Sequence, residues 1–157
     1  MKRQQVRIIL TVLTVVLTPL MASSATNCVW QGGNGSWSDA NWTVNGVPDQ
    51  TLGSAPEGHT YNDYQFDISV GQGNTLQRSG QIVMGAGTTL ELSSGTLEIT
   101  AGAGNSAFDL NGAGSEVTLS GSAVLDLTPG TGASRTLAGD EGTMNVSDSA
   151  SMIVRSY

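Results

Sequence analysis

The fold is decided by the stretch G-T-T-L-E-L-S-S-G-T-L-E-I-T, which spans residues 87–100. Leu90 and Leu92 are separated by one polar residue, and Leu97 and Ile99 repeat that arrangement seven residues later. This period of two is typical of a strand with one buried face and one solvated face. The letters S-S-G-T between the two units are turn formers. The stretch therefore predicts two short strands joined at a tight corner.

The same apolar-polar-apolar unit recurs on both sides of this stretch. Every third unit recurs at intervals of 26 to 29 residues, which fits a three-sided coil whose turns stack in parallel. Such a coil has a narrow core that needs few apolar side chains. We therefore predict an all-β fold, a parallel β-solenoid of the right-handed β-helix kind, with a sandwich and a disordered chain as open alternatives. The other units are Ile82/Met84, Phe108/Leu110, Val117/Leu119, Leu125/Leu127, the weaker Leu137, Met144/Val146 and Met152/Val154.

The chain changes character near residue 63. Apolar and polar residues alternate strictly over residues 64–70, so we place the solenoid repeats at 63–157. Residues 26–62 contain all three tryptophans and many turn dipeptides but no helical period, and we predict an irregular N-terminal cap there. Within the cap, Asn45-Gly46 suits the turn of a two-residue hairpin.

Residues 1–25 have the three parts of a secretory signal peptide. A basic start, M-K-R-Q-Q-V-R, precedes an apolar run and then small residues up to Ala25. The apolar run is shorter than the ~20 residues that a membrane-spanning helix needs. We expect cleavage after Ala25, or after Ala22, and a secreted or cell-surface protein without a stable membrane span after cleavage. An anchoring helix that stays attached is the alternative.

The charge of the mature chain limits its partners. From Thr26 onward the sequence has thirteen carboxylates, three arginines and no lysine, a net charge near −10. Nucleic acids and anionic lipids are bound through clusters of Lys or Arg that displace counterions. We therefore exclude nucleic acid as a partner.

A resemblance lies in the segment W-Q-G-G-N-G-S-W-S-D-A-N-W-T-V-N-G-V-P-D, residues 30–49. It resembles the tryptophan-bearing segment that precedes glycine-rich repeats in bacterial surface and autotransporter-associated β-strand repeat proteins. The resemblance implies a β-helical passenger on, or released from, a bacterial surface. Proteins of this family are usually far longer, so a truncated repeat array at 63–157 is left open. The match is carried by Trp30, Gly32, Gly33, Gly35, Trp37, Asn41, Trp42, Gly46 and Pro48.

The tryptophans Trp30, Trp37 and Trp42 are the candidate ligand-binding residues. Three aromatic rings within thirteen residues can form a platform on which sugars stack. Their spacings of 7 and 5 are odd, so one flat strand cannot present all three on one face. We favour a lid that covers the first turn of the solenoid, with glycans or other surface proteins as the expected partners.

Cys28 is the only cysteine, so the chain forms no internal disulfide. A lone thiol near the mature start is usually inert or buried. A lipid anchor on Cys28 is the alternative, although the preceding Asn27 suits that modification poorly.

Outward carboxylates are the remaining candidates for chemistry. In the predicted register Glu98 and Asp126 lie on adjacent turns about 4.8 Å apart, where a calcium ion could bridge them; a solvated acidic face is the simpler interpretation. His59, with Asp63 and Asp67 nearby, lacks a nucleophile motif. We predict no catalytic residue, no metal site and no cofactor.

Together these observations predict an exported, non-enzymatic structural or adhesin-like surface module of the autotransporter-passenger type. A carbohydrate-binding module that uses the N-terminal tryptophans is the alternative. A polysaccharide-active enzyme is less favoured, because β-helical enzymes of that kind use Arg or Lys to neutralise acidic substrates and this chain has three scattered arginines.

Overall fold

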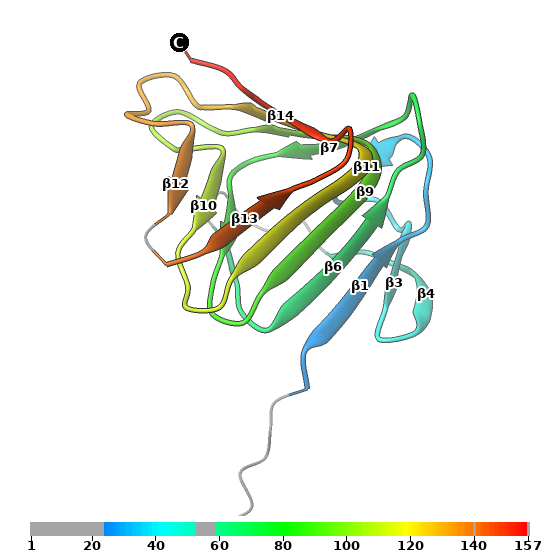
Figure 1. Cartoon of the computed structure of the whole chain (residues 1–157). Helices are drawn as coiled ribbons and strands as arrows, with labels where there is room; N and C mark the ends of the chain where they lie inside the picture. Colours follow the sequence, from blue (N-terminus) through cyan, green and yellow to red (C-terminus); the bar gives the residue numbers. More distant parts are fainter. Residues whose placement is uncertain (1–23, 53–58, 140, 157) are drawn as a thin grey trace, which may run out of the picture.

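A computed structural model describes residues 24–52, 59–139 and 141–156 of the 157-residue chain. In these ranges the chain forms fourteen strands and no helix (Figure 1). The strands are β1 (Thr26–Trp30), β2 (Gly35–Ser36), β3 (Trp42–Val44), β4 (Val47–Gln50), β5 (Thr60–Tyr61), β6 (Tyr64–Ser69), β7 (Thr75–Ser79), β8 (Ile82–Met84), β9 (Thr89–Thr100), β10 (Phe108–Leu110), β11 (Glu116–Thr128), β12 (Leu137–Gly139), β13 (Thr143–Val146) and β14 (Ser151–Val154).

The described residues include no apolar helix of the length that crossing a membrane requires. Residues 1–23 of the predicted signal peptide lie outside the described ranges, so the signal peptide and its cleavage stay predictions.

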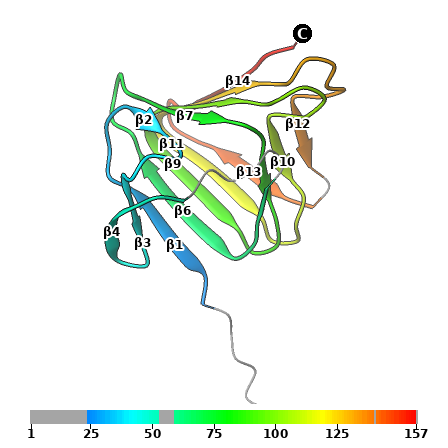
Figure 2. The ribbon, with the colours of Figure 1, turned by 180° about the vertical axis from the view of Figure 1, so that it is seen from behind.

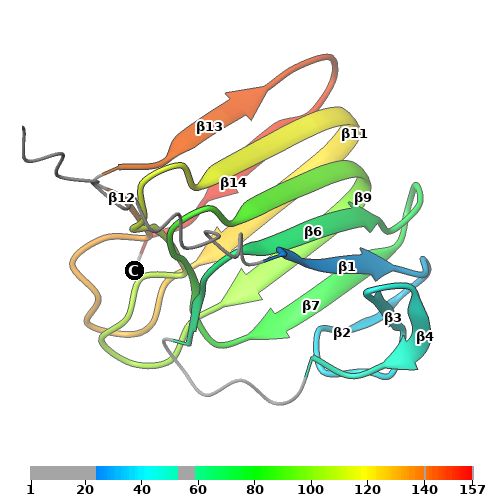
Figure 3. The same ribbon diagram turned by 90° about the horizontal axis from the view of Figure 1, so that it is seen from below.

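The strands form three faces of a parallel solenoid with about three turns, which confirms the predicted fold class (Figures 1 and 3). The first face contains β1, β6, β13 and the N-terminal halves of β9 and β11. The second face contains β2, β7, β14 and the C-terminal halves of β9 and β11. The third face contains β5, β8, β10 and β12. Because β9 and β11 each bend around a corner, they belong to two faces.

The register of the stack is the one that the spacing predicts. Each coil, meaning one complete turn of the solenoid, pairs in parallel with the next. The inward columns are Ile82–Phe108–Leu137, Leu90–Val117–Met144 and Leu97–Leu125–Met152.

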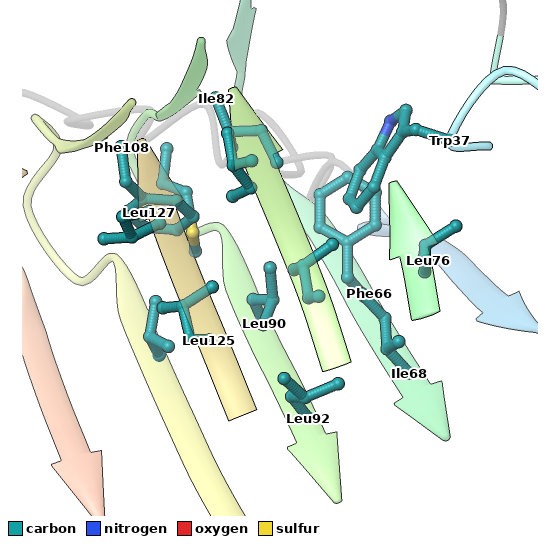
Figure 4. Close-up of a cluster of buried hydrophobic side chains, with 14 of the residues drawn as sticks. Trp37, Phe66, Ile68, Leu76, Ile82, Leu90, Leu92, Phe108, Leu125 and Leu127 are labelled. Atoms are coloured by element: carbon teal, nitrogen blue, oxygen red, sulfur yellow. The ribbon is translucent and has the colours of Figure 1, made fainter. Parts of the chain in front are cut away.

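Apolar side chains from all three faces meet along the solenoid axis (Figure 4). Leu90 and Leu92 of β9 stack on Phe66 and Ile68 of the preceding coil, and all four are almost fully buried. Burying one such side chain contributes roughly 1.5–3 kcal/mol. The core is therefore a thin column, which explains how a chain with few large apolar residues folds.

The corner between the first and second faces requires glycine. Gly95 has a φ of 75°, and a β-carbon there would lie 2.5 Å from the carbonyl oxygen of Gly71 in the preceding coil. A side chain at this position would push the two coils apart. The turn formers of the S-S-G-T segment thus allow β9 to bend without losing its contact with the preceding coil.

The N-terminal segment continues the stack and then ends it. β1 pairs in parallel with β6, whereas β3 pairs antiparallel with β1 and β4 antiparallel with β3 (Figure 2). Asn45 and Gly46 join β3 to β4 with φ values of 49° and 81°, which confirms the predicted hairpin turn. Pro48 lies in β4, the last strand at this edge, and its missing N–H hinders pairing with a further strand.

Candidate functional site

The three predicted site residues come together at the N-terminal end of the core. Trp30 lies in β1, Trp37 follows β2, and Trp42 opens β3, yet their rings pack edge to face. The ring centroids of Trp30 and Trp42 are 5.1 Å apart, and those of Trp37 and Trp42 are 4.9 Å apart. Trp37 also packs on Phe66, with centroids 5.1 Å apart. We call Trp30, Trp37 and Trp42 the tryptophan lid, because they cover the first apolar coil.

Each indole N–H of the lid has a protein acceptor. Trp37 donates to the hydroxyl of Tyr61 at 3.2 Å, and Trp42 donates to the carbonyl oxygen of Trp37 at 2.9 Å. Trp30 donates to the carbonyl oxygen of Gly33 at 3.3 Å. Hydrogen bonds of this kind offset the cost of removing a buried indole N–H from water.

The rings of the lid are inaccessible to a ligand in this structure. The exposed fractions of Trp30, Trp37 and Trp42 are 3%, 1% and 0%. A sugar-stacking platform needs an exposed ring face, and these rings use their faces and edges for one another and for Phe66. Ligand binding by the tryptophans stays a prediction, and their burial argues for the lid.

Cys28 lies in β1, belongs to the same core cluster as the lid, and is fully buried. Burial raises the pKa of its thiol from 9.0 to about 11, so the thiol is protonated and unreactive at neutral pH. A lipid on Cys28 would require the sulfur to leave the core. The side chain acts as a small apolar residue in the packing.

His59 packs its ring edge to face on Tyr61, with centroids 4.8 Å apart. Burial raises the pKa of Tyr61, which also accepts the hydrogen bond from Trp37. The only histidine of the chain therefore sits beside the aromatic cluster under the lid. Nothing in this contact assembles a nucleophile with a base.

The carboxylate pair predicted from the spacing lies on the second face. Glu98 and Asp126 are direct neighbours in the β9–β11 ladder. Arg155 reaches back from the end of β14, and its Nε donates to Asp126 Oδ1 at 2.8 Å while its Nη2 donates to Asp126 Oδ2. This two-point ion pair raises the pKa of Arg155, and the guanidinium relieves the repulsion that the two carboxylates would otherwise feel.

Sequence reasoning missed this arginine. The predicted register, extended by one position past the Leu127–Val154 pair, places Arg155 opposite Thr128, two residues from Asp126. Extending the register in this way would have indicated that Arg155 is close enough to pair with Asp126. Among the described residues no group of three or more His, Cys, Asp or Glu side chains is arranged to hold a metal ion.

The second face also holds a shallow depression of about 200 Å³. Its walls come from β7 and β9, and Gln77 donates from Nε2 to Glu98 Oε2 at 3.3 Å across it. The depression adjoins the Asp126–Arg155 pair, so hydroxyl, amide, carboxylate and guanidinium groups lie along one flat surface. Its lining residues are Gln77, Arg78, Ser79, Glu98 and Thr100.

Comparison of the chain with protein-family models, with curated proteins and with solved structures found no match in any of the three.

Proposed function

We propose that this chain is an exported, non-enzymatic structural module of the adhesin-like, autotransporter-passenger type, which works by presenting rigid polar sheet faces. The signal-like residues 1–25 and the resemblance of residues 30–49 to β-strand repeat proteins support the export and the class. The acidic, lysine-free composition after Thr26 suits a soluble surface rather than one that binds nucleic acid.

The observation that carries the proposal is the flat second face. Its outward residues form straight rows across the coils, because the parallel ladder keeps each residue in line with its counterpart. Neighbouring residues within a row are about 4.8 Å apart, and the rows cannot rearrange without breaking backbone hydrogen bonds. A rigid array of hydroxyl, amide and carboxylate groups suits many weak polar contacts with a glycan or a protein surface. The two outward rows are Gln77–Glu98–Asp126 and Ser79–Thr100–Thr128.

Export is tested by expressing the full sequence in bacteria and sequencing the N-terminus of the product in each cell fraction. We expect the protein in the medium or on the surface, beginning at Thr26 or, for the alternative cleavage site, at Ser23. A matched chain without residues 2–25 should stay in the cytoplasm. Retention of the full sequence in the cytoplasm with residues 1–25 intact would contradict the proposal.

Contact through the second face is tested on a glycan array and on whole bacterial cells. Glu98→Lys changes the depression on the second face, whereas Glu91→Lys makes the same charge change on the first face of β9. We expect bound protein to decrease at least severalfold for Glu98→Lys and to stay near wild type for Glu91→Lys. Equal effects of both changes would show that net charge, and not this face, governs the contact.

The carbohydrate-binding alternative predicts a different result in the same experiment. If sugars were bound by the tryptophan lid, Glu98→Lys would leave binding intact and Trp37→Ala would abolish it. The burial of all three indoles makes the second face the better candidate for glycan contact.

A further inference from the structure

The depression on the second face has walls made of hydrogen-bonding side chains. There β7 and β9 lie side by side, and β11 continues the face beyond β9 (Figure 3). The outward side chains of Gln77, Ser79 and Thr100 supply amide and hydroxyl groups, and Glu98 supplies a carboxylate. None of the described residues that line the depression is aromatic. A ligand in it is therefore recognised through hydrogen bonds and not through ring stacking.

The charges around the depression limit the charge of its ligand. Arg78 is only 4% exposed, so its guanidinium contributes little to the surface. The Nε and Nη2 groups of Arg155 donate to the carboxylate of Asp126, and this ion pair has no net charge. The carboxylate of Glu98 then leaves the lining with a negative charge at its surface. Carboxylate, sulfate and phosphate groups on a ligand would be repelled by it.

The lining suits a ligand that carries neighbouring hydroxyl groups. A carboxylate accepts hydrogen bonds through two oxygens, while an amide or a hydroxyl group both donates and accepts. Gln77 Nε2 donates to Glu98 Oε2 at 3.3 Å, so these two side chains are already oriented toward each other. The hydroxyl groups of a sugar also donate and accept, and an uncharged sugar meets no repulsion from Glu98. Uncharged sugars therefore match both the polar groups and the charge of the depression.

The polar surface continues beyond the depression along the stack. Glu98 and Thr100 have Asp126 and Thr128 as their neighbours in the next coil, about 4.8 Å away. This spacing is close to the length of one pyranose ring in an extended β-1,4-linked chain. A sugar in the depression would thus place the next sugar of such a chain beside Asp126 and Thr128.

We propose that the depression and the adjoining Asp126–Thr128 surface bind an uncharged, extended glycan chain, with one sugar on each coil. The inference rests on the proposed role of the second face as a contact surface, and it adds the chemical class of the ligand. Because the ligand has no charge and the contacts are hydrogen bonds, binding is insensitive to salt.

The class of ligand is tested with three hexamers that share the β-1,4 linkage and differ in charge. They are cellohexaose, which is neutral, a glucuronic acid hexamer, which is anionic, and a chitosan hexamer, which is cationic. Each is titrated by calorimetry into the chain purified from cells that express the full sequence. We expect cellohexaose to bind best, with a dissociation constant that changes less than about twofold between low and high salt. No binding of cellohexaose, or tighter binding of either charged hexamer, would overturn the inference.

The place of binding is tested with a change that keeps the shape of the strand. Thr100→Val removes one hydroxyl from the depression and should raise the dissociation constant of cellohexaose roughly threefold to tenfold. The matched control, Thr118→Val, makes the same change at an outward position of the first face and should bind as wild type does. Circular dichroism checks that both variants fold. Equal affinities of the two variants would overturn the placement in the depression.

A change of charge separates this inference from the proposed function. Glu98→Gln keeps a hydrogen-bonding group in the depression, so it should alter the affinity for cellohexaose by less than about twofold. A large loss in Glu98→Gln would overturn the inference, because the charge of Glu98 would then govern binding. Binding to whole cells that is lost in Glu98→Lys, without any binding of cellohexaose, would overturn the class of ligand and leave the second face as the contact surface.

Discussion

Single glycine residues control how closely the coils stack. At Gly95 a positive φ of 75° coincides with a close approach to the preceding coil, since a β-carbon would lie 2.5 Å from the oxygen of Gly71. At Gly104 the φ is 83°, yet a β-carbon would meet nothing within 4 Å. These two glycines therefore separate the cost of the backbone conformation from the cost of the close approach.

We predict that Gly104→Ala lowers the free energy of unfolding by about 1–2 kcal/mol, the cost of a left-handed residue with a β-carbon. Gly95→Ala carries that same cost and also forces two coils apart, which adds about 1–3 kcal/mol. Urea unfolding of both variants measures the difference. Equal losses would show that the coils at Gly95 are not packed as closely as the structure has them.

The tryptophan lid predicts a structural result for Trp37→Ala. Removing the indole leaves a cavity over Phe66 and an unpaired Tyr61 hydroxyl, so we expect a loss of about 3–5 kcal/mol. Trp37→Phe should lose less, because it fills part of the space. The measurement is thermal and urea unfolding, with glycan binding recorded in parallel. An unchanged melting temperature together with lost glycan binding would contradict the lid.

Cys28 should make the free energy of unfolding depend on pH in the alkaline range. The pKa of its thiol is about 11 in the folded chain against an ordinary 9.0, so the folded state holds the proton more tightly than the unfolded state does. The free energy of unfolding should be unaffected by this group below pH 9 and should fall as the pH rises to about 11. Burial also raises the pKa of Tyr61, so the measurement is the difference between wild type and Cys28→Ala. Identical pH profiles would contradict the burial of the thiol.

At the level of strands, β14 is held by its ladder with β11 and by side chains at its end. Arg155 pairs with Asp126, and the hydroxyl of Thr136 donates to the carbonyl oxygen of Arg155. These contacts tie the end of β14 both to the second face and to the residue that precedes β12. They support β14 on the side of its ladder with β11.

We predict that Arg155→Ala speeds amide hydrogen exchange in β14 and changes global stability by less than about 1 kcal/mol, because the guanidinium is half exposed. The double variant with Glu98→Gln should recover part of the protection, since it removes the repulsion between Glu98 and Asp126. The matched control is Arg135→Ala, which removes an exposed arginine of the last coil. Equal exchange in the two single variants would contradict a specific role for Arg155.

Much of the strand arrangement could be predicted from the sequence because the physical signals are local and periodic. Alternation identifies each strand, and the nearly constant spacing of every third unit places Leu97 beside Leu125 and Glu98 beside Asp126, as the structure confirms. The ion pair of Asp126 with Arg155 could not be read in this way. It depends on where a long, flexible side chain reaches after the strands are aligned.

The periodic sequence pattern does not predict the contacts of the tryptophan lid either. Its three rings come from β1, from the residue after β2 and from β3, so their contacts depend on an antiparallel hairpin folding back on a parallel stack. The sequence supports both a lid and a sugar platform, because both need clustered aromatic rings. Only the burial of the rings and the acceptors of their N–H groups distinguish the two.

For the whole molecule, the stack behaves as a one-dimensional array in which each coil is stabilised by its neighbours. The tryptophan lid and the hairpin cover one end, and in the described part of the chain β12, β13 and β14 each pair with strands of one neighbouring coil only. Unfolding should therefore begin at β12, β13 and β14 and move toward the lid.

Amide hydrogen exchange along the chain tests this account most directly. We predict the slowest exchange in β1, β6 and the N-terminal half of β9, and progressively faster exchange through β11 to β13 and β14. Slow exchange in β13 and β14 together with fast exchange in β1 and β3 would contradict the closed lid on which the account depends.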